Sequence, residues 1–295
     1  MQIVSSLGAL ALRGCTVCIG AFDGVHRGHQ ALLSRARELA GASGGPAVVV
    51  TFDPPPKTVF LGTKFLSSLE DKLHLLAVFA PRAVVAVPFD ETYAKTHKAA
   101  FLDELRRLTP TAVVVGEDFR FGRGREGGLD DLSHVAPKLE VFGLEHLGGV
   151  PVKSSLIRAL LIEGDVSEAA RFLGHPYIAT GTVTAGDRRG REIGFPTANV
   201  SLSPLKALPP GVYAVRVDTE KGRFGGMANV GPRPSFPGEP PALEAHLFDF
   251  SGDLYGRKIT VTFKHLLRGQ RRFSGLEELK SQLSEDERQA RALLA

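Results

Sequence analysis

A ten-residue segment near the start of the chain, Gly20-Ala-Phe-Asp-Gly-Val-His-Arg-Gly-His29, constrains the fold more than any other stretch. It follows a β-branched apolar run, residues 15–19, and precedes residues 30–39, whose pattern is helical. A strand that passes through a glycine-rich turn into a helix points backbone N–H groups and the positive helix end at whatever lies above the turn. His26 and His29 lie on one face of the first helical turn. The segment therefore predicts a binding site in which the imidazoles of His26 and His29 bind a nucleotide triphosphate.

The same turn supplies the other residues of the predicted site. Its glycines, Gly20, Gly24 and Gly28, let the backbone approach a ligand without a Cβ clash. Phe22 and Asp23 complete the predicted nucleotide-binding set. The alternative interpretation is a pair of surface histidines near a helix start, and the preceding strand and the Phe-Asp-Gly turn favour the phosphate site over it.

Composition narrows the class of protein. A length of 295 residues suggests two domains, and 43% hydrophobic residues is ordinary for a globular protein. The net charge of +4 suits a protein that binds anionic small molecules and is weak for a dedicated nucleic-acid protein. We find no apolar run of membrane-spanning length and no charged segment typical of a secretory signal at the start. With only two cysteines, a cytoplasmic location is the default expectation.

The two cysteines form a C-x-x-C pattern, Cys15-Thr-Val-Cys18. A redox or zinc role requires a turn or helix start, but these residues read as a strand, along which positions three apart point to opposite faces. The pattern therefore indicates two small buried hydrophobic residues.

The first part of the chain alternates apolar runs with helical patterns. The expected strands are Cys15–Gly20, Ala47–Phe52, Ala83–Pro88, Ala112–Gly116 and Leu139–Phe142. The expected helices are Gln30–Ala40, Glu70–Phe79, Lys98–Leu108, Asp130–Ala136, Ser154–Glu163 and Val166–Leu173. Continuous Val-rich strands suit a parallel sheet buried on both faces. This rhythm predicts an α/β doubly wound domain, residues 1–175, with ligands at the carboxyl ends of its strands.

The pattern changes near Tyr177, where short β-like runs separated by Gly/Pro turns begin. The expected strands are Gly181–Ala185, Val212–Val217, Gly225–Val230, Leu243–Phe250 and Lys258–Leu266. Such spacing predicts an antiparallel sandwich or barrel over residues 176–295. Two capping-box patterns, at Ser274 and Ser284, predict two successive C-terminal helices.

The Gly20–His29 segment resembles the signature of the nucleotidylyltransferase superfamily. In its Gly-x-Phe-Asp-Gly-Val-His-x-Gly-His form it is similar to the adenylyltransferase half of bacterial bifunctional riboflavin kinase/FAD synthetases. That family usually carries a histidine between two prolines after the second strand, where this chain has Pro55.

Two further segments of the first domain resemble the same family. Gly116-Glu-Asp-Phe-Arg-Phe-Gly122 provides Asp118 for a ribose or ring donor, and Phe119 or Phe121 to stack on a flavin, with one of these rings expected in the core. Val152-Lys-Ser-Ser-Leu-Ile-Arg158 is similar to a triphosphate-binding motif. Ser154, Ser155 and Arg158 match it, whereas Lys153 replaces a serine.

The second domain contains no G-x-x-x-x-G-K-[ST] motif, so a kinase here needs another phosphate cradle. The run from Gly181 to Asn199 resembles the riboflavin kinase signature, including Gly-Phe-Pro-Thr-Ala-Asn. Thr197 and Asn199 lie on one side of an extended segment, and their oxygens suit Mg²⁺ beside nucleotide phosphates. Four glycines provide the expected cradle: Gly181, Gly186, Gly190 and Gly194.

Later motifs match that signature in order, among them Met227-Ala-Asn-Val-Gly-Pro-Arg-Pro-Ser235 and Leu243-Glu-Ala-His-Leu-Phe-Asp-Phe250. The resemblance implies that Glu244 is the general base and that Arg272 belongs to a region that covers flavin. It further implies Mg²⁺ and ATP, with riboflavin, FMN and FAD as substrates and products.

The resemblance thus implies two reactions, phosphorylation of riboflavin to FMN and adenylylation of FMN to FAD, with small-molecule partners and neither nucleic acid nor membrane. The first alternative is a riboflavin kinase whose adenylyl transfer is impaired by Pro55 and Lys153. The second is a nucleic-acid-binding protein, and its candidate side chains are Arg188, Arg189, Arg268, Arg271 and Arg272. Sparse aromatic residues disfavour the second alternative. The oligomeric state is not determined by the sequence.

Overall fold

The computed structural model describes residues 1–186, 190, 193–231 and 242–295. The chain divides into two compact units, Met1–Ser154 and Ser155–Ala295.

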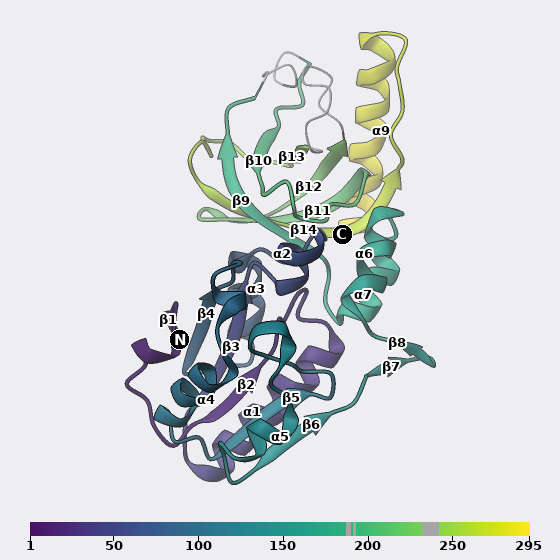
Figure 1. The fold of residues 1–295 in the computed structure, drawn as a ribbon. Coiled ribbons are helices and arrows are strands. Elements are labelled where there is room, and N and C mark those ends of the chain that lie inside the picture. Colours follow the sequence, from purple (N-terminus) through teal and green to yellow (C-terminus); the bar gives the residue numbers. More distant parts are fainter. Residues whose placement is uncertain (187–189, 191–192, 232–241) are drawn as a thin grey trace. The chain divides into compact units, whose positions relative to one another are not determined.

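The first unit contains a six-stranded parallel sheet in the order β1-β4-β3-β2-β5-β6 (Figure 1). Its strands are β1 Gln2–Val4, β2 Thr16–Ile19, β3 Ala47–Asp53, β4 Ala83–Pro88, β5 Ala112–Gly116 and β6 Leu139–Phe142. The five strands expected from the apolar runs are therefore confirmed, and β1 is an additional short edge strand. The chain moves outward from β2 through β3 to β4, then returns to the other side of β2 as β5. This reversal places a topological switch point between β2 and β5.

Helices cover both faces of this sheet, as a doubly wound fold requires. Helices α1 (Arg27–Ser43) and α3 (Leu69–Ala77) pack on one face, and α4 (Lys98–Arg107) and α5 (Leu129–Ser133) pack on the other. Shorter elements are η1 (Leu7–Ala9), α2 (Pro56–Leu61), η2 (Tyr93–Lys95), η3 (Arg123–Arg125), β7 (His146–Leu147) and β8 (Val150–Pro151).

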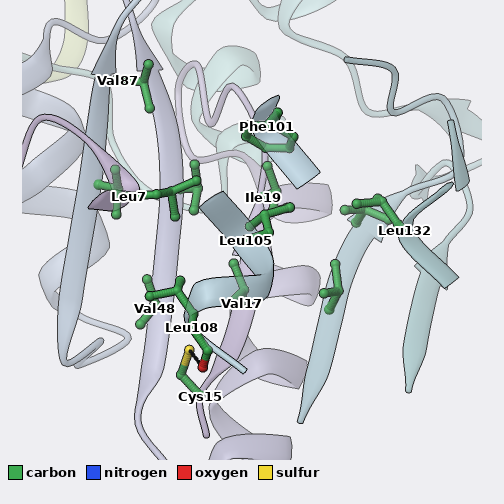
Figure 2. Packing of buried hydrophobic residues seen from close by; sticks show 14 of the residues in the cluster. Leu7, Cys15, Val17, Ile19, Val48, Val87, Phe101, Leu105, Leu108 and Leu132 are labelled. Atoms are coloured by element: carbon green, nitrogen blue, oxygen red, sulfur yellow. Dashed lines mark hydrogen bonds between the residues drawn. The ribbon is translucent and has the colours of Figure 1, made fainter. Parts of the chain in front are cut away.

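Strand β2 shows how the sheet separates the two cores. Cys15, Val17 and Ile19 enter the core that also contains Leu105 of α4 and Leu132 of α5 (Figure 2). Cys18 points to the opposite core, which lies under α1 and α3. Both cysteines are free and buried, and burial raises the pKa of the Cys15 thiol to about 11. The prediction that they are small buried hydrophobic residues is confirmed.

The second unit contains a closed antiparallel barrel in the order β10-β13-β12-β11-β14-β9. Its strands are β9 Ile178–Thr184, β10 Ala198–Ser201, β11 Gly211–Thr219, β12 Gly222–Gly231, β13 Ala242–Leu247 and β14 Lys258–Arg268. The sequence did not predict β10 as a strand, because it is only four residues long and half polar. The expected antiparallel architecture is confirmed.

Helices α6 (Ser154–Ile162) and α7 (Val166–Leu173) form where the sequence predicts them. Apart from Ser154, they belong to the same compact unit as the barrel. The hydroxyl of Tyr213 in β11 donates to the carbonyl oxygen of Gly164, between the two helices, over 3.3 Å. Helix α7 also contacts β14.

The C-terminus corrects the expectation of two helices, because one continuous helix, α9, extends from Leu276 to Leu294. The hydroxyl of Ser284 donates to the carbonyl oxygen of Lys280 over 3.0 Å instead of capping a new helix. No glycine or proline interrupts this stretch, so the helix continues through it. Residues Ala290 and Leu294 of α9 pack against Met227 and Phe248 on the outer face of the barrel.

Candidate active sites

The turn after β2 is held in an unusual backbone conformation at the carboxyl edge of the sheet. Phe22, Gly24 and Val25 have positive φ angles of 48°, 85° and 41°. Such angles are costly for Phe and Val, so surrounding contacts must hold them. A Cβ on Gly20 would lie 3.0 Å from the Phe22 ring, which explains the glycine there. Phe22 itself is fully buried, so its side chain supports the turn from the core and is not presented to a ligand.

Asp23 fastens this turn to the segment that precedes α3. Its carboxylate is 5% exposed and accepts the N–H groups of Leu66 and Ser67 over 2.7 and 3.1 Å. The N–H of Gly24 donates to the Ser67 hydroxyl over 2.6 Å. The two hydrogen bonds to the Asp23 carboxylate therefore hold the turn against the segment before α3.

The two signature histidines lie together at the start of α1. His26 is the N-cap residue, and its Nδ1 accepts the N–H of His29 over 3.4 Å. The imidazole rings stack with centroids 3.6 Å apart. A Cβ on Gly28 would lie 3.4 Å from the His26 ring, so a larger residue would crowd the pair. The structure thus brings together the imidazole pair expected from the sequence.

Burial, followed by the charges of His26 and Lys72, holds the pKa of His29 well below its usual range. His29 is therefore neutral at pH 7. Its Nδ1 is buried and has no hydrogen-bond partner among the residues that the structure describes. A neutral imidazole can donate one hydrogen bond to a phosphate oxygen.

The segment after β5 lies on the other side of the switch point. Asp118 is exposed there, and Phe119 is partly buried against the core. Phe121 is only 7% exposed, and its ring lies 5.1 Å from that of Phe101 in the same core. Of the two rings expected to stack on flavin, Phe121 thus belongs to the core, and Phe119 is the more accessible.

Sequence reasoning missed an aromatic surface at the carboxyl ends of β3 and β4. Phe60 of α2 is 61% exposed, and its ring packs edge-on against Phe89 at 5.8 Å. Phe89 in turn contacts Phe52 and Tyr93, each with ring centroids 5.7 Å away. The signal available in the sequence was an aromatic residue at the carboxyl end of each of two successive strands, Phe52 at β3 and Phe89 after β4.

The Ser-Ser-x-x-Arg motif begins α6. The hydroxyl of Ser154 donates to the carbonyl oxygen of Asp23 over 3.0 Å, so Ser154 contacts the signature turn directly. Ser155 is exposed, and Arg158 is half-buried one helical turn beyond Ser154. Ser155 and Arg158 fall in the second compact unit.

In the barrel, strand register aligns polar residues from separate motifs. Asn199 of β10 lies directly opposite Glu244 of β13, and Glu244 lies opposite Asn229 of β12. Directly opposed residues share a face of a sheet, so these three side chains form one row. Met227, two residues from Asn229, packs against α9, so the row lies on the outer face of the barrel. We call Asn199, Glu244 and Asn229 the polar row.

Three of the four predicted glycines adjoin other chain segments closely. A Cβ on Gly186 would lie 2.2 Å from the Asn199 amide, and one on Gly190 would lie 2.3 Å from the Phe195 carbonyl oxygen and 3.6 Å from the Thr197 hydroxyl. A Cβ on Gly181 would meet the Ser201 carbonyl oxygen at 2.4 Å, so this glycine serves strand packing. Gly194 has a φ of 88°, which favours glycine. Gly186 therefore lies against Asn199, and Gly190 lies near Thr197.

Two residues not predicted from the sequence support the polar row. The Nδ1–H of His246 donates to the carbonyl oxygen of Pro196 over 2.7 Å, which ties the Pro-Thr-Ala-Asn segment to β13. The amide of Gln270 donates to the side-chain oxygen of Asn229 over 2.9 Å. Arg272 is exposed between β14 and α9. The Arg188 and Arg189 positions and the Pro-Arg-Pro-Ser segment lie outside the described residues.

Fold and sites together define a transferase with a nucleotidylyltransferase-like unit and a flavokinase-like barrel. Residues 9–157 match the FAD synthetase family, and residues 173–294 match the riboflavin kinase family. The chain belongs to the family of bifunctional riboflavin kinase/FMN adenylyltransferases. The enzyme of that name from Escherichia coli K12 is 38% identical over 98% of this chain and 95% of its own length. The one from Pseudomonas fluorescens is 39% identical over 100% and 98%, respectively.

A solved structure from Streptococcus pneumoniae, described as a macrolide-efflux protein, is also similar. It is 28% identical, covers 98% of both chains and has a TM-score of 0.84. In the described part of the present chain, we find no helix with the length and apolar character needed to cross a membrane.

Proposed function

We propose that the two reactions of this family are divided between the carboxyl edge of the parallel sheet and the polar row of the barrel. The enzyme phosphorylates riboflavin to FMN with ATP, then transfers AMP from a second ATP to FMN, which gives FAD and pyrophosphate. The observation that carries the assignment is the convergence of motif residues distant in sequence. Glu244 lies opposite Asn199, and Ser154 contacts the turn at Asp23.

Adenylyl transfer is assigned to the stacked histidines and the Ser-Ser-x-x-Arg motif. FMN phosphate is already an anionic nucleophile, so this reaction needs charge neutralisation and positioning, and no general base. In the proposal, His26, His29, Ser154, Ser155 and Arg158 bind the triphosphate, with N–H groups of the turn at Gly20, Gly24 and Gly28. The turn is shaped for this task by Phe22 and Asp23.

The flavin ring of FMN is assigned to the aromatic side chains at the same edge of the sheet. Phe119 retains partial exposure, and Asp118 is exposed beside it. The Phe60–Phe89 pair provides a second flat apolar surface, and edge-to-face aromatic packing holds it in place.

Phosphoryl transfer is assigned to the polar row. In the proposal, Glu244 accepts the proton of riboflavin's terminal hydroxyl as that oxygen attacks the γ-phosphorus of ATP. Asn199 and Asn229 flank the carboxylate and restrict its orientation. The backbone at Gly181, Gly186, Gly190 and Gly194 is assigned to the phosphates, and Arg272 is assigned to the flavin.

Magnesium is part of this proposal, and the residues present suit it. Thr197 and Asn199 offer hard oxygen ligands beside Gly190 and Gly186. Within the described residues, no three His, Cys, Asp or Glu side chains gather as metal ligands. This is compatible with an ion held by few protein oxygens together with phosphates and water, which is usual for Mg²⁺·ATP. When bound, the ion neutralises charge on the β- and γ-phosphates.

The remaining assignments follow from this division. Residues 1–175 are proposed as the adenylyltransferase domain and residues 176–295 as the kinase domain. A nucleic-acid role finds little support, because Arg268 pairs with Asp286 and Arg271 pairs with Glu278.

The test is incubation with riboflavin, ATP and Mg²⁺, followed by chromatographic separation of the flavins. We expect both FMN and FAD to accumulate. Accumulation of FMN alone, even with excess ATP, would contradict the adenylyl-transfer assignment and favour an enzyme with riboflavin kinase activity only. Conversion of supplied FMN without use of riboflavin would contradict the kinase assignment.

A further inference from the structure

Lys72 of α3 is a buried charged residue to which neither reaction assigns a role. Its side chain is 0% exposed. The Nζ donates to the carbonyl oxygen of Phe52 over 2.8 Å and to the hydroxyl of Thr51 over 3.3 Å. Both acceptors belong to the carboxyl end of β3. An apolar residue of similar volume would avoid the desolvation penalty of several kcal/mol that a buried ammonium carries.

The contacts of Lys72 continue into the signature turn. The hydroxyl of Thr51, which accepts from Nζ, donates to the carbonyl oxygen of Ala21 over 3.0 Å. Ala21 lies between the end of β2 and the positive-φ residue Phe22. The Thr51 hydroxyl therefore links the Lys72 ammonium by hydrogen bonds to the backbone of the proposed phosphate-binding turn.

The charges around Lys72 also belong to that turn and its neighbours. The carboxylates of Asp23 in the turn and Asp53 at the end of β3 favour its charged form, but burial outweighs them and lowers the pKa of Lys72 to about 8. On α1, His29 responds to the Lys72 charge with a lowered pKa, and His26 contributes in the same direction. Lys72 therefore remains mostly protonated at pH 7, and its charge acts on His29.

We propose that Lys72 is a positioning residue for adenylyl transfer, whose buried ammonium holds the β2–α1 turn through Thr51 and adds positive charge beneath the phosphates. The inference rests on the proposed location of the adenylyl-transfer site at this turn. A fixed positive charge in a site of low dielectric stabilises the negative charge that develops at the α-phosphorus.

The test compares Lys72→Met with wild type in the full chain, with FMN and ATP as substrates. Methionine keeps the unbranched shape and removes the charge. We expect kcat/KM for adenylyl transfer to fall about 10- to 100-fold, while riboflavin kinase activity of the same molecules stays within about twofold. Lys138→Met is the matched control, because Lys138 is a half-exposed residue that directly precedes the edge strand β6, three strands away from β3.

The pH dependence separates the proposed role from simple loss of packing. In wild type, kcat/KM for adenylyl transfer should be highest below pH 8 and fall as the pH rises through about 8, where Lys72 loses its proton. The kinase reaction should lack this inflection, and Lys72→Met should abolish it. This wild-type measurement remains decisive if Lys72→Met fails to fold.

The proposal would be overturned by near-normal adenylyl transfer in Lys72→Met, or by a wild-type profile that is flat from about pH 7 to 9. A second variant, His29→Ala, separates the proposed role of Lys72 from the proposed location of the adenylyl-transfer site. If His29→Ala is strongly impaired and Lys72→Met is not, only the role of Lys72 is wrong. If both are normal, the site itself lies elsewhere.

Discussion

Individual residues acquire their roles from their neighbours across strands and turns. Glu244 is half-buried between two amides, and His29 is held against a second imidazole and a buried phenyl ring. These environments lie in separate compact units. A substitution at one residue should therefore affect one reaction and leave the other as an internal control.

Glu244→Gln preserves shape and hydrogen bonding but removes the basic carboxylate. General-base assistance is typically worth ~10²- to 10⁴-fold, so riboflavin kinase turnover should fall by about that factor. Conversion of supplied FMN to FAD should be nearly unchanged, and both rates can be measured on one preparation. Near-normal kinase turnover would mean that Glu244 is only a strand-face carboxylate and that the base is another group.

His29→Ala should show the reverse pattern. It removes one ring of the stacked pair and one donor to the triphosphate, so FAD formation from FMN should fall by about 10²-fold or more, as for loss of one preorganised donor. Riboflavin phosphorylation should persist. Equal loss of both activities would indicate unfolding, which circular dichroism would detect.

At the scale of elements, α9 shows how one buried ion pair attaches a helix to the barrel. Asp286 is 1% exposed and accepts from the guanidinium of Arg268, the last residue of β14, with a shortest distance of 2.8 Å. The hydrophobic residues Ala290 and Leu294 complete the contact. Removing one partner of such a pair leaves the other charge without compensation.

Asp286→Asn should therefore destabilise the second unit by roughly 2–4 kcal/mol, below the full range for buried pairs because Arg268 retains some exposure. The measurement is the urea concentration at which half the riboflavin kinase activity is lost. Glu285→Gln is the matched control on the same helix, because Glu285 forms an exposed pair with Arg288. Equal midpoints for the two variants would contradict a structural role of the Asp286 pair.

At the scale of the whole molecule, the boundary given by the family match differs from the boundary between the two compact units. The riboflavin kinase match begins at residue 173, whereas the compact unit that contains the barrel begins at Ser155. Helix α6 carries Ser155 and Arg158, which are assigned to adenylyl transfer, yet α6 and α7 belong to the same compact unit as the barrel. Tyr213 exemplifies this packing, because its buried hydroxyl contacts the Gly164 carbonyl oxygen.

Two fragments test this difference, one beginning at Ser155 and one at Leu173. Both should keep riboflavin kinase activity, since every kinase motif lies beyond residue 180. The shorter fragment lacks the buried Phe172 side chain, worth about 1.5–3 kcal/mol, so its Tm should be lower by at least ~5 °C. Calorimetry measures this difference. Equal Tm values would show that α6 and α7 contribute nothing to the stability of the barrel.

The sequence by itself determined most of the strands and helices along the chain and the identity of the chemical motifs, although it missed β1 and β10. Val-rich runs and the Gly20–His29 segment are local patterns, and short-range preferences of the backbone are enough to translate them into elements. The capping pattern at Ser284 failed for the same reason. A local signal cannot show that the hydroxyl will bond to the preceding turn inside a continuous helix.

Tertiary structure alone decided which distant residues meet. The opposition of Glu244 to Asn199 and Asn229 depends on strand register, and a shift of one residue would turn Glu244 to the other face. The burial of Phe121 and Lys72 likewise depends on how strands and helices pack. Register and burial arise from contacts between residues far apart in the chain, so local sequence patterns do not encode them directly.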